Sequence, residues 1–463
     1  MSMPRFFVGF GGALVLGGLL AASFLWVADQ YRGSLALSTL IAPAIDVLKN
    51  KKTPEELLTE ALEKSKNIRG LYMTADVAID PGAGATRLRN HLVGLATSTE
   101  INGFVIDVKE VCGPDYNEER LREFVRDLKE KEIWTIARIV VFKDASQIKV
   151  HPEWYLKRNT PIAVGNECWN KRHLVVKSDV NQPAPISTEW SPITSNQTFW
   201  RDKRGGWWFD PAHPGAREYI LEFSKKMIDL GFDELQFDYI RFPSDGDVQN
   251  AIYPAWNGKT QKYDVMKSFF EFLNKGLKAH KPDIILSADL FGYAAIRAGD
   301  VGIGQRLDDI GDNFDYISFM VYPSHYYSGF YMDEDIERNL PVVNLNRFQA
   351  REYPGVIIER SLLFARDFLD GKLATSSMTF LPTAATSTAT STIDVVAEPA
   401  PRSKARLRPW LEDFFHEDDA ASGRPSGIKK VRLQIEAAER AEGHGWMLWN
   451  AANVYTEQAL QKE

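Results

Sequence analysis

Eight strand-like runs alternate along the chain with amphipathic helical stretches, and this alternation restricts the possible folds more than any other feature of the sequence. The runs lie at residues 69–76, 101–109, 133–142, 233–240, 283–291, 316–323, 405–414 and 445–450. Helical stretches lie between them, including 118–131, 215–231, 264–280 and 427–443. Eight strands separated by helices match a closed parallel barrel, so we predict an α/β fold, a (β/α)8 TIM barrel, over residues 67–460. An open doubly wound sheet is the alternative, but no glycine-rich nucleotide loop follows the first run.

Two segments interrupt the regular alternation. Residues 143–210 are too long for a simple connection, and they hold Trp154, Trp169, Trp190, Trp200, Trp207 and Trp208. Long loops inside compact domains are usually functional, so we predict that this long loop after the third strand overhangs the mouth of the barrel. Residues 373–404 are rich in Ala, Ser, Thr and Pro, a composition typical of a flexible low-complexity insertion.

The N-terminus carries a long apolar run. Residues 6–28 contain no charge, and a helix of these 23 residues is long enough to cross a bilayer. We predict an N-terminal transmembrane helix within residues 1–32 that anchors the protein, with the barrel on the extracytoplasmic side of the membrane. A cleaved signal segment, which would make the protein secreted, is the alternative. Residues 33–66 are expected to form a spacer with one helix, capped by Thr53 and Glu56.

The composition argues against several partners and chemistries. The net charge is −7 and no basic stripe occurs, so no nucleic acid is expected to bind, because phosphate neutralisation needs clustered Lys and Arg. The eight histidines have no H-x-H or H-E-x-x-H spacing, and neither a G-x-S-x-G elbow nor a Walker loop occurs. We therefore expect no metal and no cofactor. The twelve Trp and sixteen Tyr suit sugar rings, although most aromatic residues pack in cores.

The chain has two cysteines, Cys112 and Cys168, and both fall in predicted loops. In an exported chain they could form a disulfide. Two unpaired thiols are an equally good interpretation, because two cysteines define no disulfide framework.

Polar and aromatic side chains gather at the carboxyl ends of the predicted strands, where barrels of this type carry their chemistry. The candidate catalytic residues are Asp107, Asp238 and Asp289. The candidate substrate-binding residues are Lys109, Arg138, Tyr322, His325, Trp410, Trp449 and Asn450. A pair of carboxylates is what a glycosidase needs, since one attacks or activates water and the other protonates the leaving oxygen.

The two-residue period of a strand predicts which side chains point inward. In the fourth run, Leu235, Phe237 and Tyr239 share the face expected to pack against helices. Gln236 and Asp238 then point into the barrel. The same argument turns the acid of the fifth run inward, so two carboxylates on adjacent strands are expected at one mouth.

Simpler roles are possible for the acids of the fourth run. Asp238 could pair with Arg138 or Arg241 and only close the top of the barrel, since structural ion pairs are also common among inward acids. Asp233 and Glu234 come first in the run and belong to the opposite end of the barrel. We expect these two to be solvated.

Six motifs together resemble a bacterial family of glycoside hydrolase domains whose function is otherwise unknown. They are "QFDYIRFPSDG", "SADLFGY", "DVGIGQ", "DYISFMVYPSHY", "RPWLEDF" and "GWMLWNAANVYT", and they cover roughly residues 67–458. That family is similar to α-amylase-type (β/α)8 glycosidases, and this likeness implies that Asp238 is the nucleophile and Asp289 the proton donor. Amylase-type enzymes normally carry Glu at the donor position and a neighbouring His-Asp on the eighth strand. This chain has neither, so the resemblance implies no particular substrate.

The sequence therefore predicts a membrane-anchored glycoside hydrolase that cleaves an extracellular or envelope polysaccharide. Asp238 is expected to act as nucleophile or base, Asp289 as general acid, and Asp107 as a stabilising or substrate-binding acid. The rival hypothesis is a cell-surface carbohydrate-binding barrel without catalysis. It is favoured if Arg138 and Lys109 neutralise the inward acids in a closed network.

Overall fold

The computed structural model describes residues 52–114, 116–160, 167–168, 198–297, 299–373, 402–441 and 443–462. The chain divides into two units, Met1–Leu57 and Leu58–Glu463. The described part of the first unit includes the start of helix α3 (Pro54–Lys64), where the Glu56 amide donates to Thr53 Oγ1 at 3.2 Å. The Thr53 amide donates to Glu56 Oε2 at 2.7 Å, which completes the predicted capping box.

The predicted membrane anchor at residues 6–28 lies outside the described residues, as do most of the predicted spacer and residues 374–401 of the predicted insertion. Within the described ranges, no helix combines the length and the apolar character needed to span a bilayer.

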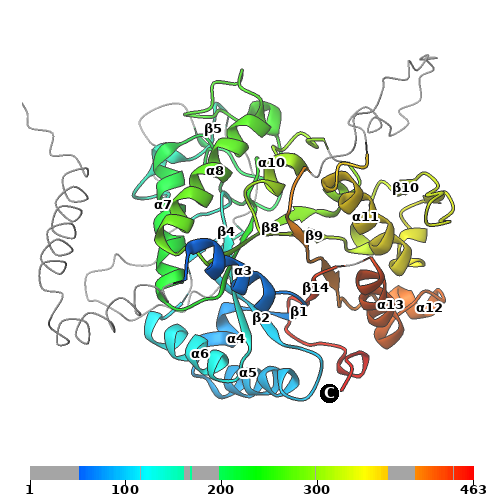
Figure 1. Ribbon diagram of the computed structural model, residues 1–463. Helices are drawn as coiled ribbons and strands as arrows, with labels where there is room; N and C mark the ends of the chain where they lie inside the picture. The colour runs from blue at the N-terminus through cyan, green and yellow to red at the C-terminus, as the bar shows by residue number, and fades with distance from the viewer. Residues whose placement is uncertain are drawn as a thin grey trace, which may run out of the picture. The chain divides into compact units, whose positions relative to one another are not determined.

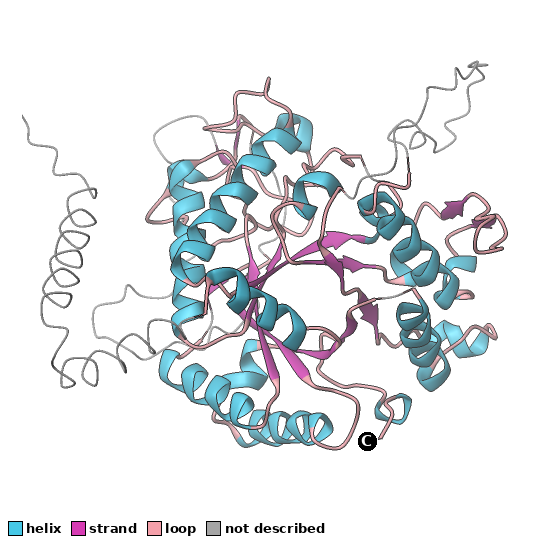
Figure 2. Cartoon of the chain, viewed as in Figure 1, coloured by secondary structure: helices cyan, strands magenta, loops and turns pink. Residues whose placement is uncertain are grey.

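Eight parallel strand positions close into a barrel, which confirms the predicted fold (Figures 1 and 2). The strands are β1 (Ile68–Met73), β2 (Gly103–Glu110), β4 (Trp134–Val140), β7 (Glu234–Asp238), β8 (Ile285–Phe291), β9 (Tyr316–Met320), β12 (Arg406–Leu407), β13 (Trp410–Glu412) and β14 (Gly445–Trp449). β12 and β13 both pair with β9 and together fill the seventh position. The barrel closes because β1 pairs with both β2 and β14.

Helices surround the ring of strands, as Figure 2 shows. They are α4 (Ala75–Ile79), α5 (Ala83–Ala96), α6 (Glu118–Glu130), α7 (Pro214–Asp229), α8 (Lys262–His280), α9 (Gly292–Ala295), α10 (Leu307–Gly311), α11 (Pro354–Leu369), α12 (Glu417–Ala421) and α13 (Gly427–Arg440). Four of the predicted helical stretches correspond to α6, α7, α8 and α13. Short antiparallel strands decorate the loops: β3 (Gly113–Pro114), β5 (Lys157–Arg158), β6 (Thr198–Phe199), β10 (Phe330–Met332) and β11 (Val343–Leu345).

Most of the buried apolar side chains described pack in two layers, one between the strands and the helices and one inside the barrel, and a smaller third cluster lies within residues 326–357. The inner layer contains Ile68, Tyr72, Val105, Ile136, Tyr322, Trp410 and Met447. Because it fills the interior, the barrel is a packed core, and chemistry is expected at its carboxyl end.

The prediction that Glu234 is solvated is wrong. Its side chain is fully buried at the amino end of the barrel, where Arg408 Nη1 donates to both of its oxygens at 2.8 and 2.9 Å. Arg408 Nη2 also donates to the carbonyl of Ser65 at 2.9 Å, so the chain before β1 covers this end and excludes water. Asp233 is half-buried and accepts a hydrogen bond from Thr135 Oγ1 at 2.7 Å.

Arg408→Leu is expected to lower the free energy of unfolding by about 3–5 kcal/mol, because Glu234 would remain buried without its counter-charge. Urea unfolding of the variant and the wild type measures the difference. The matched control joins Arg408→Leu to Glu234→Met, which removes the orphaned charge and should recover much of the lost stability. Equal stability of Arg408→Leu and the wild type would contradict the prediction.

Candidate active site

A cleft of about 570 Å³ opens at the carboxyl end of the barrel. The strands contribute Arg138, Asp238, Asp289, Phe291, Met320, Trp410 and Trp449 to its lining. The long connection after β4 adds Lys143, Asp202, Arg204 and Trp208, so the described parts of this connection do overhang the mouth as predicted. Trp169 and Trp190 lie outside the described residues. A cleft of this size is large enough to take a small ligand or part of a chain-like one.

Asp238 stands at the end of β7 with its carboxylate in the cleft. Arg138 Nη2 donates to its Oδ2 at 2.5 Å, and the backbone amide of Tyr239 donates to its Oδ1 at 2.6 Å. Of the two predicted ion-pair partners, Arg138 is therefore the one that pairs with Asp238. Arg241 lies farther than 4.0 Å from it.

Asp289, on the neighbouring strand β8, is almost completely buried at the floor of the cleft. Trp410 Nε1 donates to its Oδ1 at 2.8 Å, and its Oδ2 lies 4.0 Å from Arg138 Nε. Burial raises the pKa of the Asp289 carboxyl well above its usual range, and the negative charge of Asp238 raises it further, although Arg138 opposes both effects. Asp238 and Asp289 thus lie near the same guanidinium, that of Arg138. Their surroundings differ, because Asp238 is in a close ion pair with Arg138 whereas Asp289 is more deeply buried and lies farther from it.

Asp107 contacts Arg138 on the side away from Asp238 and Asp289. Arg138 Nη1 donates to its Oδ1 at 2.5 Å, and the Tyr72 hydroxyl donates to its Oδ2. Its side chain is 1% exposed and does not line the cleft. The structure therefore brings Asp107 against Arg138, with Arg138 between Asp107 and the two acids of the cleft.

Four of the predicted substrate-binding residues, besides Arg138, line the cleft: Tyr322, His325, Trp410 and Trp449. Trp410 is only 2% exposed and contributes its indole N–H to Asp289, so it offers no open face to a ligand. Burial raises the pKa of the Tyr322 phenol, and the charges of Asp289 and Asp238 add to the increase. Tyr322 therefore keeps its proton as a hydrogen-bond donor.

Lys109 and Asn450 do not join this cleft. Lys109 is fully buried and pairs with Asp144, with 2.7 Å between Nζ and Oδ2. The register of β2 shifts between Asp107 and Lys109, so the two side chains do not follow the regular alternation of a strand, and Lys109 does not reach the cleft although it was predicted to bind substrate. Asn450 donates to the carbonyl of Asp413 at 2.6 Å and lines a neighbouring hollow.

Tyr239 is misplaced by the sequence analysis, which assigned it to the face that packs against helices. β7 ends at Asp238, and Tyr239 adopts a left-handed backbone with φ of 51°. This conformation is uncommon for a residue with a side chain, and it reverses the strand's alternation. As a result, Tyr239 and Arg241 both line the cleft.

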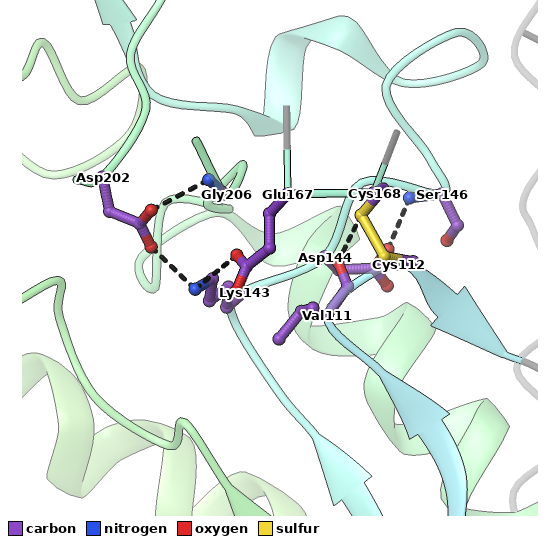
Figure 3. Close-up of a disulfide and its surroundings, with 9 residues drawn as sticks. All are labelled: Val111, Cys112, Lys143, Asp144, Ser146, Glu167, Cys168, Asp202 and Gly206. Atoms are coloured by element: carbon purple, nitrogen blue, oxygen red, sulfur yellow. Dashed lines mark hydrogen bonds and ion pairs between the residues drawn. A yellow bond between two sulfur atoms is a disulfide. The ribbon is translucent and has the colours of Figure 1, made fainter. Parts of the chain in front are cut away.

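Several lining residues escaped the sequence analysis because their signals are weak. Lys143 lies three residues after the end of β4, whereas Asp202 and Arg204 lie deep in a loop with no periodic pattern. Lys143 Nζ lies 2.6 Å from Glu167 and 2.9 Å from Asp202 (Figure 3). In the sequence, the one signal for the cluster of Lys143, Glu167 and Asp202 is that Lys143 comes shortly after a predicted barrel strand.

A disulfide ties the long connection to the loop after β2. Cys112 and Cys168 are bonded, with their Cα atoms 5.6 Å apart, so the paired alternative is the one the structure adopts (Figure 3). Glu167 precedes Cys168 and reaches Lys143 at the edge of the cleft. The disulfide therefore holds part of the cleft's rim in place.

The variant with Cys112→Ser and Cys168→Ser is expected to lose about 2–4 kcal/mol of unfolding free energy, because the bond restricts the unfolded chain across 56 residues. Urea unfolding with and without a thiol reductant measures the loss. The reductant should shift the unfolding midpoint of the wild type but not that of the variant. An unchanged wild-type midpoint, after thiol titration shows full reduction, would contradict the prediction.

Comparisons with known proteins give one family match and several distant structural neighbours. A hypothetical protein from Ruminiclostridium thermocellum is 26% identical, over 47% of this chain and 96% of that chain, with a TM-score of 0.33. A family GH13_31 enzyme is 16% identical over 57% of this chain and 54% of its own, with a TM-score of 0.35. The maltogenic α-amylase AmyB from Thermotoga neapolitana is 14% identical over 85% of this chain and 69% of its own, with a TM-score of 0.39.

These TM-scores are too low for the solved structures to bear on the function of this chain, and no curated protein matches it. The family match, in contrast, covers most of the chain. The family model covers residues 70–455, a range that includes every strand of the barrel except its first two residues, and every residue of the cleft. The chain therefore belongs to the family described as "Putative glycosyl hydrolase domain".

Proposed function

We propose that this protein is a glycoside hydrolase that cleaves O-glycosidic bonds of an extracellular or envelope polysaccharide. The observation that carries the proposal is the placement of Asp238 and Asp289 on adjacent strands of one cleft, within 2.5 and 4.0 Å of the same guanidinium. Glycosidases need such a pair, with one carboxyl group ionised and the other protonated.

The unlike surroundings of the two acids assign their roles. Asp289, whose pKa is raised, gives its proton to the leaving oxygen as the C–O bond breaks. Asp238 attacks the anomeric carbon, or removes a proton from the water that attacks it. In the first route, water then hydrolyses the glycosyl ester of Asp238, supplies the hydroxyl of the new reducing end and returns a proton to Asp289. In the second route, the attacking water supplies that hydroxyl, and the proton that Asp238 takes replaces the one that Asp289 gave. Arg138 stabilises the charge on Asp238, and Asp107 positions Arg138.

Aromatic side chains at the rim provide surfaces for the sugar rings. The Trp449 ring lies 6.3 Å from that of Tyr322, and both line the cleft. At the outer edge, the rings of His325 and Tyr327 stack with centroids 5.7 Å apart, and Tyr327 is 68% exposed. Flat apolar faces of this kind suit the C–H faces of sugars. Asn450 stays outside this group.

A carbohydrate-binding barrel without catalysis is the second candidate, favoured by the close ion pair between Arg138 and Asp238. The charges argue against it. Arg138 is shared among Asp107, Asp238 and Asp289, while Lys109 is occupied by Asp144, so the three acids are not neutralised by a closed network. Three acids share one arginine, so at least one acid, the buried Asp289, lacks a full counter-charge. A hydrolase needs such an acid as its proton donor, whereas a protein that only binds sugars does not.

The proposal includes a location outside the cytoplasm, with residues 1–32 as a membrane anchor. Two features support it. Residues 6–28 carry no charge over a length that spans a bilayer. The disulfide between Cys112 and Cys168 is typical of proteins from oxidising compartments. Protease protection of the chain in intact cells would test the orientation, and digestion of the barrel only after lysis would contradict it.

The deciding experiment is a screen of soluble polysaccharides with the full chain. We expect new reducing ends from at least one polysaccharide, and proton NMR of the fresh product then reveals whether the anomeric configuration is retained or inverted. Binding without any release of reducing ends, across the panel, would favour the carbohydrate-binding alternative.

A further inference from the structure

Arg241 is a buried cation on the wall of the cleft that the proposed hydrolysis leaves unused. It follows Asp238 by three positions, its side chain is 7% exposed, and it lines the same cavity as the two acids. A buried charge is costly to fold unless it is paired, so an arginine kept here needs an explanation.

Its surroundings hold the guanidinium firmly but do not neutralise it. Three rings surround the cation, with their centroids 5.1 Å (Trp208), 5.1 Å (Tyr239) and 4.5 Å (Phe291) from it. Among the described residues, no carboxylate lies within 4.0 Å of Arg241. Burial lowers the pKa of the guanidinium more than Tyr239 and Asp238 raise it. The rings supply packing and cation–π attraction, and the counter-charge is missing.

One edge of the guanidinium remains free. Nη1 donates to the carbonyl of Phe242 at 3.0 Å, and this is the single hydrogen bond that Arg241 makes with the described part of the chain. The Nε and Nη2 groups are therefore left as a parallel pair of donors. Such a pair fits both oxygens of a carboxylate, with two charge-assisted hydrogen bonds in one plane.

Other cations of the cleft differ from Arg241 in this respect. Arg138 is held by Asp107 and Asp238, and Lys143 is held by Glu167 and Asp202. Arg204 is the exception. It is exposed at the rim of the cleft, where the structure shows no ion pair for it with any described residue. Unpaired positive charge thus extends from the wall to the rim.

The acids near Arg241 do not fill its free edge. Asp245 lines the cleft too, but it is exposed and accepts a hydrogen bond from the Lys203 amide at 3.1 Å. Asp202 is occupied by Lys143 and by Trp208 Nε1, which donates to it at 2.9 Å. Because Arg241 lines the cleft and is in no ion pair with a described residue, a ligand in the cleft can meet its guanidinium without displacing an existing ion pair.

We propose that the cleft recognises an acidic glycan, and that a sugar carboxylate binds the Nε and Nη2 edge of Arg241. This inference rests on the proposed function and deepens it, because it names the substrate class of the same site. Arg241 is a binding residue beside the bond to be cleaved, and Arg204 attracts the polyanion at the rim. Neutral glycans would leave the buried cation without its counter-charge.

Isothermal titration calorimetry tests the inference on the full chain carrying Asp238→Asn, which binds substrate without consuming it. The probes are matched pairs with one backbone each: oligogalacturonate and its methyl ester, and malto- and cello-oligosaccharides with their C6-carboxylate forms. Sulfated forms of the neutral members separate carboxylate recognition from attraction to any anion. We expect the carboxylate member of one pair to bind tighter by on the order of tenfold or more.

Arg241→Gln, added to the Asp238→Asn variant, should abolish the preference for the carboxylate. The matched control is Arg126→Gln in the same variant, which should leave the preference unchanged because Arg126 is exposed on α6. Arg241→Lys keeps the charge but not the planar edge, so it should lose part of the preference for carboxylate over sulfate. This variant decides the matter if Arg241→Gln does not fold. The inference is overturned if no pair shows a preference, if sulfate binds as well as carboxylate, or if the preference survives both substitutions.

Turnover by the wild type separates this inference from the hydrolase proposal. Hydrolysis of neutral glycans alone would overturn acidic recognition and leave the hydrolase standing. Tight carboxylate-dependent binding without any turnover would support the site at Arg241 and count against the hydrolase.

Discussion

Asp238→Asn is expected to lower kcat by on the order of 10⁴-fold, with little change in the affinity for substrate. The amide keeps the shape of the carboxylate and can still accept a hydrogen bond from Arg138, which lies 2.5 Å away in the wild type. It cannot attack the anomeric carbon or take a proton from water. The loss therefore falls on the chemical step, where an interaction made only in the transition state is removed.

The measurement is release of reducing ends under saturating substrate, with calorimetry to confirm binding. Asp127→Asn is the matched control, because Asp127 lies on the exposed surface of α6 and the same chemical change there should leave kcat unaltered. Thermal unfolding of both variants separates a lost reaction from a lost fold. Equal turnover by Asp238→Asn and the wild type would remove Asp238 from the mechanism.

The barrel and its two principal acids could be predicted from sequence because both depend on local periodicity. Apolar runs and amphipathic stretches fix which segments are strands and which are helices. Within a regular strand, alternation then decides the face, and Gln236 confirms the argument by donating to Ser318 Oγ inside the barrel at 3.2 Å. The inward placement of Asp238 and Asp289 follows from the same geometry.

The rest of the site depends on features that a period does not encode. The left-handed residue Tyr239 ends the alternation of β7, and the register shift in β2 sends Lys109 to Asp144. Glu234 is buried because a segment before β1 covers the barrel's amino end, a contact between distant parts of the chain. Likewise the counter-charges of Lys143 come from two points of a long loop, which no local pattern brings together.

Asp289→Asn is expected to lower kcat by about 10²- to 10⁴-fold on natural glycosides, which is the usual contribution of a general acid. An aryl glycoside with a very acidic leaving group, such as a dinitrophenolate, needs no proton on its leaving oxygen. Its turnover should therefore change far less than that of the natural substrate. A loss of the same size on both substrates would contradict the role of Asp289 as proton donor, and Asp127→Asn again serves as the control.

The pH dependence of turnover gives a second test of Asp289 as the proton donor. Burial and the charge of Asp238 raise the pKa of Asp289, so its proton persists to a higher pH than on an ordinary carboxyl group. Turnover of natural glycosides should fall as the pH rises through that raised pKa, and this alkaline limb should vanish in Asp289→Asn. The hydrogen bond from Trp410 lowers the pKa of Asp289, so Trp410→Phe should move the limb to higher pH. A limb that stays in place in both variants would belong to another group and would exclude Asp289 as the acid.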